Sequence, residues 1–249
     1  MNTKQAGGSG PHQLQIALKS LKNVDWKDKR ILDIGCSNGY ITSEILKLTQ
    51  AKEIIGIDIE FDRISKANEL KHKIGESRLK FFKADSTNLS RFDDNSFDGI
   101  FSNMTFQQIS PDKLPVAFKE VKRLLKPSGL AIINFNQRKS DVTFEINKLL
   151  QEKNTTRFKK LNLELFKDYA TKAGFSKVKC IARPDTYYHK SLENLLGNSK
   201  DANWRFKNAK LTEMQIEEIW EKVRDIFRKR KTPLGYKELW NMVFAQLVK

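Results

Sequence analysis

Three aspartates stand where short apolar runs of this sequence end. Asp33 lies in the run Ile-Leu-Asp-Ile, Asp58 closes Ile-Ile-Gly-Ile-Asp, and Asp85 follows Leu-Lys-Phe-Phe-Lys-Ala. A carboxylate accepts hydrogen bonds from hydroxyl and amino groups and attracts a cation. If the three runs are neighbouring parallel strands, their carboxyl ends share one edge of the sheet, where open α/β sheets bind ligands. The three acids then form one candidate binding site.

A turn with two glycines follows the first of these runs. Gly35 and Gly39 allow the backbone to approach a ligand closely, and the helix expected after them offers unpaired N–H groups to a carboxylate. A pyrophosphate-binding turn would need glycine at positions 37 and 40, which are Ser37 and Tyr40. The turn therefore favours a nucleoside-like ligand that carries a carboxylate over a dinucleotide.

The three acids suit different polar groups of such a ligand. Asp33 can hold an ammonium group, Asp58 can accept hydrogen bonds from both ribose hydroxyls, and Asp85 can accept one from the adenine amino group. Taken alone, each acid is more often an ordinary surface or capping residue. Their regular placement after successive runs is what indicates a site.

Apolar runs that alternate with helical patterns position these residues. Strands are expected at residues 30–34, 53–57, 79–83, 97–102, 130–135, 177–182 and 242–248. Helices are expected at residues 12–22, 40–48, 63–72, 113–125 and 163–173. The alternation predicts an α/β fold in which a seven-stranded, mostly parallel sheet has helices on both faces.

The length suits one α/β domain with an elaboration. We expect a single domain over residues 1–249, whose core comprises residues 12–182 and 234–249. Between the last two expected strands, two segments have apolar residues at helical spacing. Residues 183–233 are therefore predicted to form an inserted helical cap over the substrate pocket.

The composition is that of a globular protein, with 39% hydrophobic residues. No apolar run approaches the ~20 residues that span a bilayer, and residues 1–11 lack the apolar core of a signal peptide. We therefore expect a cytoplasmic protein that does not associate with membranes. Cys36 and Cys180 are far apart and belong to no Cys/His cluster, so neither a disulfide nor a metal site is expected.

The formal net charge of +16 is unevenly distributed. Residues 1–136 carry 21 basic and 16 acidic side chains, whereas residues 137–249 carry 25 and 14. Such an excess attracts nucleic acid, an acidic protein or a small polyanion. It is equally compatible with a lysine-rich solvated surface, because no arginine-rich arm or aromatic stripe accompanies it.

Residues 25–136 resemble the class I, Rossmann-like S-adenosylmethionine-dependent methyltransferases. The resemblance rests on Asp33, Gly35, Gly39, Asp58 and Asp85, and on the segments Asp-Asp-Asn-Ser-Phe-Asp-Gly-Ile (93–100) and Val-Lys-Arg-Leu-Leu-Lys-Pro-Ser-Gly-Leu (121–130). Ser37 and Ser128 depart from it, since both replace glycines of the family pattern. More narrowly, residues 102–109 and 187–196 look like the trans-aconitate and malonyl-carrier-protein carboxyl O-methyltransferases.

This resemblance implies S-adenosylmethionine as the cofactor and assigns further residues to two sites. The implied cofactor-binding residues are Asp33, Gly35, Cys36, Ser37, Gly39, Asp58, Ile59, Ala84, Asp85, Ser86 and Asn103. The implied wall of the acceptor pocket comprises Phe106, Gln107, Arg183, Tyr187 and Tyr188. For the aromatic residues, ordinary core packing is an equally good interpretation.

Methyl transfer from a sulfonium is an in-line displacement that needs alignment and exclusion of water rather than a protein nucleophile. His189 is the one candidate general base, although single histidines at helix starts are more often structural or exposed. A carboxylate acceptor would need no base.

The favoured function is therefore methyl transfer to a small-molecule or carrier-linked carboxylate. Two alternatives stay open. One is an RNA or protein methyltransferase that docks its acceptor on the basic C-terminal half, and the other is a non-catalytic partner subunit that keeps the cofactor fold.

Overall fold

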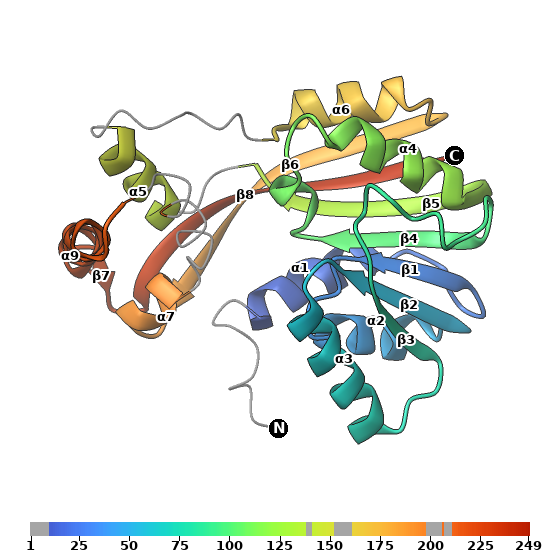
Figure 1. The fold of residues 1–249 in the computed structure, drawn as a ribbon, viewed down its shortest axis with the longest axis horizontal. Coiled ribbons are helices and arrows are strands. Elements are labelled where there is room, and N and C mark those ends of the chain that lie inside the picture. Colours follow the sequence, from blue (N-terminus) through green and yellow to red (C-terminus); the bar gives the residue numbers. More distant parts are fainter. Residues whose placement is uncertain (1–9, 138–140, 152–160, 198–205, 207–210) are drawn as a thin grey trace. The chain divides into compact units, whose positions relative to one another are not determined.

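A computed structural model describes residues 10–137, 141–151, 161–197, 206 and 211–249 (Figure 1). The chain divides into two compact units. We call Gln13–Gln137, Lys160–Ala182 and Val243–Lys249 the sheet unit. We call Met1–His12, Arg138–Lys159 and Arg183–Met242 the helical unit.

The strands are β1 (Arg30–Ile34), β2 (Glu53–Asp58), β3 (Leu79–Lys83), β4 (Phe97–Asn103), β5 (Leu125–Asn136), β6 (Lys177–His189), β7 (Lys231–Thr232) and β8 (Gly235–Val248). The described helices are α1 (Gly10–Leu21), α2 (Tyr40–Thr49), α3 (Phe61–Ile74), the 3₁₀ turn η2 (Phe106–Gln108), α4 (Leu114–Leu124), α5 (Asp141–Gln151), α6 (Leu163–Lys172), α7 (Leu192–Gly197) and α9 (Glu213–Arg228).

The sheet has the strand order β3-β2-β1-β4-β5-β8-β6, with β7 paired to β8. The β1–β2, β2–β3, β1–β4 and β4–β5 pairs are parallel. The end of β8 meets the starts of its neighbours, because Lys249 N–H donates to Gly129 O and Ser176 N–H to Val248 O. From these contacts, β8 runs antiparallel to β5 and β6. The strand order reverses between β1 and β4, the position at which such sheets bind ligands.

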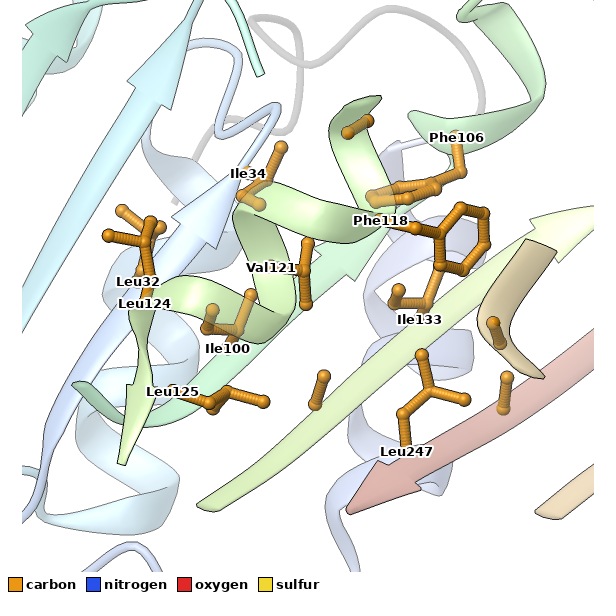
Figure 2. Close-up of a cluster of buried hydrophobic side chains, with 14 of the residues drawn as sticks. Leu32, Ile34, Ile100, Phe106, Phe118, Val121, Leu124, Leu125, Ile133 and Leu247 are labelled. Carbon is orange, nitrogen blue, oxygen red and sulfur yellow. The ribbon is translucent and has the colours of Figure 1, made fainter. Parts of the chain in front are cut away.

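Both faces of the central strands are buried, as expected for a parallel sheet covered by helices. In β1, Leu32 and Ile34 belong to a cluster with helices α4 and α6, whereas Ile31 points to the opposite cluster, which contains residues of α1, α2 and α3. Figure 2 shows the first cluster, where Phe118 and Val121 of α4 lie over the sheet. Apolar residues on both sides explain why the sequence reads as continuous hydrophobic runs rather than as alternation.

The helical unit has a core of its own. Side chains of α5, α7 and α9 form it together with Phe206. Helix α9 begins at a capping box, in which Thr212 and Gln215 each bond the other's backbone N–H. A short hairpin between β7 and β8 follows α9, and the Thr232 hydroxyl donates to Gly235 O across its turn.

The predicted α/β fold is confirmed, with differences at the last strands. β6 continues to His189 and β8 begins at Gly235, so both are longer than expected and contribute residues to both units. This extension places residues 183–189 in a strand rather than in a helical cap. The two helical patterns expected between them correspond to α7 and α9, while residues 198–205 and 207–210 of the predicted cap lie outside the described residues. Within the described ranges, no helix is both long and apolar enough to cross a membrane.

Candidate functional site

The carboxyl ends of β1, β2, β3 and β4 meet at one edge of the sheet, because these strands are parallel neighbours. Asp58 is the last residue of β2, and Asp85 stands two residues beyond β3. Backbone bonds join the loops that follow: Ala84 N–H donates to Asp58 O at 3.0 Å, and Gly35 N–H donates to Ile57 O at 2.8 Å. The edge therefore brings together the residues that the sequence placed after separate strands.

Asp33 lies inside this edge and is only 3% exposed. Its register partner in β2 is Gly56, and the Thr42 hydroxyl of α2 donates to its Oδ2 at 2.6 Å. Burial raises the pKa of Asp33 to about 7, the Thr42 bond opposes that shift, and the negative charge of Asp58 adds to it. Asp33 and Asp58 are thus close enough to interact. Asp33 is a buried carboxyl whose charged form a nearby cation would stabilise.

Asp58 is held by backbone donors from two loops. Ser37 N–H donates to its Oδ2 and Glu60 N–H to its Oδ1, each at 3.0 Å. The guanidinium of Arg63, in the first turn of α3, lies 3.7 Å from Oδ2 and is half exposed. These bonds fix the carboxylate between the glycine turn and the start of α3.

Asp85 bonds its own loop. Its Oδ1 accepts from the backbone N–H and the hydroxyl of Thr87, at 2.9 and 2.8 Å. Ala84, Asp85 and Ser86 are all half-buried. The loop after β3 is therefore ordered with its side chains partly accessible.

The turn after β1 adopts left-handed backbone conformations at three positions. Gly35 and Gly39 have φ of 82° and 76°, and Ser37 between them has φ of 51°. A Cβ at Gly35 would collide with the side chain of Thr105, so this turn approaches the β4 loop more closely than any other residue type permits. Ser37 occupies a left-handed conformation that glycine adopts more readily than other residues.

Two neighbouring apolar side chains are exposed beside Asp58. Ile59 is 56% exposed and Phe61, the first residue of α3, is 66% exposed. Cys36, by contrast, is buried, and burial together with the charge of Asp33 raises the pKa of its thiol. The Cys36 thiol is therefore neutral and unsuited to nucleophilic attack.

Asn103, the last residue of β4, bonds the first helix. Its amide donates to Gln13 O in α1 at 3.2 Å, and its Oδ1 accepts from Asn134 at 3.3 Å.

Gln107 accepts from the Asn136 N–H at 2.6 Å. Phe106 is fully buried and packs edge-on against Phe118, as Figure 2 shows. Phe106 therefore packs in the core, which is the second interpretation that the sequence left open for the aromatic residues.

The other expected pocket residues lie in the helical unit, along the second half of β6. Arg183 is exposed, and Tyr187 and Tyr188 are half-buried. His189 is 1% exposed, and its Nε2 lies 2.8 Å from the buried Glu238 Oε2. His189 is therefore a buried hydrogen-bond partner of Glu238, which agrees with the more common, structural interpretation of a single histidine.

Three residues at the edge were not singled out from the sequence. Thr42 bonds Asp33, Thr105 covers Gly35, and Arg63 faces Asp58. Thr42 lies in the first turn of α2 and Arg63 in the first turn of α3. This position at the start of a helix is the signal that could have identified these two residues. Thr105 has no comparable local signature.

The donor set of this edge fits S-adenosylmethionine. Asp33, a buried carboxyl with no ion-pair partner among the described residues, suits an ammonium. Asp58, an ordered carboxylate beside exposed apolar side chains, suits a ribose attached to a flat base. Among the residues that the structure describes, no group of three or more His, Cys, Asp or Glu side chains could hold a metal ion.

Comparisons with known proteins agree with this chemistry. Residues 31–129 match a family described as methyltransferase domain. Sterol 24-C-methyltransferase erg-4 of Neurospora crassa is 36% identical over 104 residues, which are 41% of this chain and 26% of that protein. Malonyl-[acyl-carrier protein] O-methyltransferase of Priestia megaterium is 33% identical over 118 residues, covering 47% of this chain and 40% of the relative. The chain spans between 26% and 40% of the length of the first curated relatives that it matches.

A solved structure extends the likeness to nearly the whole fold. Phosphoethanolamine N-methyltransferase 2 of Haemonchus contortus, in complex with S-adenosyl-L-methionine, superimposes with a TM-score of 0.60. The alignment covers 96% of this chain and 52% of that chain, at 18% identity. At this identity the likeness establishes a shared fold.

Proposed function

We propose that the chain methylates a carboxylate on a small molecule or on a carrier-linked substrate. The premise is that residues 31–129 form a class I methyltransferase domain that uses S-adenosylmethionine. The observation that carries the cofactor part of the proposal is the buried Asp33 beside Asp58, at the edge where the strand order reverses. Few other ligands combine an ammonium, a ribose and a carboxylate in one molecule.

Four side chains would hold the cofactor. Asp33 would accept the ammonium group, and its raised pKa would fall once a cation lies beside it. Asp58, already ordered by Ser37 N–H and Glu60 N–H, would accept the ribose hydroxyls. Ile59 would cover one face of the base, which removes an exposed apolar side chain from water. Asp85 would accept a hydrogen bond from the adenine amino group.

When bound, S-adenosylmethionine supplies an electrophilic methyl group on a sulfonium. The protein's part is to align the acceptor and to exclude water, because the reaction is a single in-line displacement. A carboxylate acceptor is already a nucleophile at neutral pH, so no side chain must remove a proton. The buried pairing of His189 with Glu238 agrees with a reaction that uses no histidine base.

The acceptor class rests on two supports. The malonyl-[acyl-carrier protein] O-methyltransferase relative is named for methyl transfer to an acyl-carrier substrate, although the match covers 47% of this chain. The excess of basic side chains in residues 137–249 would attract a carboxylate or an acidic carrier protein.

Labelled methyl transfer into a cell extract tests this proposal. The extract is incubated with the protein and methyl-labelled S-adenosylmethionine, and then separated into small molecules, protein and RNA. We expect label in the small-molecule or carrier-protein fraction that mild alkali releases as methanol, because methyl esters hydrolyse under conditions that leave N-methyl and C-methyl groups intact. The Asp58→Ala variant is the matched control and should transfer far less label.

Other distributions of label would contradict the carboxylate acceptor. Alkali-stable label in RNA or in protein would instead support the RNA or protein methyltransferase alternative. If calorimetry detects no S-adenosylmethionine binding by the folded protein, the chain is a non-catalytic member of the fold.

A further inference from the structure

A cleft of about 790 Å³ lies within the helical unit. It is formed by the start of α7, one face of α9, β7 and the first residues of β8, elements that Figure 1 labels. All of its lining residues belong to the helical unit. This volume is within the range of small-molecule sites in proteins.

The lining combines flat apolar surface with positive charge. Trp220 and Tyr236 contribute aromatic rings, and Trp220 packs edge-on against Phe206 at 5.8 Å, which supports the indole from the core. Leu192 and Leu196 of α7 add aliphatic surface. A ring or acyl chain entering the cleft would therefore find apolar contacts.

Four cationic side chains line the cleft, against two acidic ones, Glu193 and Glu221. Two of the four are already paired: Arg224 bonds Glu217 and Glu221, and Arg228 bonds Asp225. The remaining two are Lys190 and Lys231. Within the described part of the chain, neither of these lysines lies within ion-pair distance of a carboxylate.

The backbone holds these two lysines in one neighbourhood. Lys231 pairs with Tyr236 in the β7–β8 hairpin. Gly235, with φ of 115°, approaches the end of β6 so closely that an added Cβ would collide with His189 O and lie 3.9 Å from the Lys190 Cα. Two uncompensated ammonium groups thus border the same aromatic cleft.

We propose that this cleft binds a small organic dianion, such as an aryl phosphate, with its apolar part on Trp220 and its charged group facing Lys190 and Lys231. The inference goes beyond methyl transfer and does not depend on it. Two ammonium donors match a doubly charged group, and a planar indole favours an aromatic body over a free inorganic ion.

Phenyl phosphate binding to the full-length protein tests the proposal, measured by calorimetry and by tryptophan fluorescence in 50 mM salt. We expect saturable binding with a Kd below about 1 mM. The Lys190→Gln/Lys231→Gln double variant should weaken it at least about tenfold. A matched control, Lys229→Gln/Lys237→Gln, removes the same charge from exposed lysines of the same unit outside the cleft, and should change the Kd less than about twofold.

Two results would overturn the proposal. Equal weakening by both double variants would mean that only the overall charge attracts the ligand. On the wild-type protein alone, which needs no variant to fold, benzyl alcohol binding as tightly as phenyl phosphate would exclude recognition of the dianion. S-adenosylmethionine affinity, measured in parallel, should be the same in both double variants and separates this site from the cofactor site.

Discussion

The Thr42 hydroxyl donates a 2.6 Å hydrogen bond to Oδ2 of the buried Asp33 carboxyl. This bond joins α2 to β1, the strand that leads into the glycine turn. It is one hydrogen bond against nearly complete burial, so Asp33 keeps a pKa of about 7 instead of the ordinary 3.8. Asp33 is therefore an acid whose charged form a bound cation would stabilise further.

The Asp33→Asn variant should lose cofactor affinity while gaining stability. The amide oxygen can still accept from Thr42, but it no longer attracts an ammonium, so we expect S-adenosylmethionine binding to weaken by about tenfold to a hundredfold. Calorimetry measures this change. Unaltered affinity in the folded variant would remove Asp33 from the cofactor site.

The same carboxyl should make stability depend on pH. The folded protein keeps the Asp33 proton up to about pH 7, whereas the unfolded chain loses it near pH 3.8. Because the folded pKa is raised, this group favours folding below pH 4 and progressively less as the pH rises to 7. The advantage of Asp33→Asn over wild type in thermal melting should therefore grow between pH 4 and 7 and then level off. A difference that is constant across this range would contradict the assignment.

Cofactor binding should release a proton near neutral pH. An ammonium beside Asp33 favours the ionised carboxyl, so affinity should rise as the pH increases through about 7. Calorimetry at pH 6.5 in buffers of different ionisation enthalpy should show proton release by the wild type. The Asp33→Asn variant should show none from this group.

Asp58→Ala should weaken S-adenosylmethionine binding by about 1–3 kcal/mol, because it removes charge-assisted bonds to the ribose hydroxyls. The matched control is Asp62→Ala, which removes the same charge from an exposed position of the first turn of α3. Calorimetry should find the control within a factor of two of wild type. If both variants bind equally, Asp58 has no direct role.

Ser37→Gly should stabilise the protein by up to about 1 kcal/mol. Ser37 has φ of 51°, a conformation that costs an L-residue energy and glycine little. The backbone N–H that bonds Asp58 is retained in the variant. Thermal melting should show Ser37→Gly above wild type and Ser37→Ala at or below it. Equal melting of the two variants would show that the conformation carries no strain.

His189→Ala should destabilise the protein by about 3–5 kcal/mol, since it leaves the buried Glu238 without its partner 2.8 Å away. Denaturant unfolding measures the loss. The exposed pair Lys172–Asp168 provides the comparison, because Lys172→Ala should cost less than about 1 kcal/mol. A His189→Ala variant that is fully stable but inactive would restore the candidate general base.

The amino-acid sequence alone determined the strands, the parallel sheet and the three acids at its edge. Those features depend on local patterns: strands buried on both faces read as apolar runs, and Gly35 and Gly39 mark backbone conformations that other residues adopt at a cost. The exact ends of β6 and β8 were less predictable, because long strands shared between two units have mixed exposure.

Only the tertiary structure decided what each polar or aromatic side chain contacts. The sequence placed Phe106 and His189 near a pocket, whereas packing against Phe118 and pairing with Glu238 bury them. The raised pKa of Asp33 likewise depends on burial and on the proximity of Asp58, which is 25 residues away in the chain. Residue type sets what a group can do, but its energy depends on neighbours that the fold brings from distant segments.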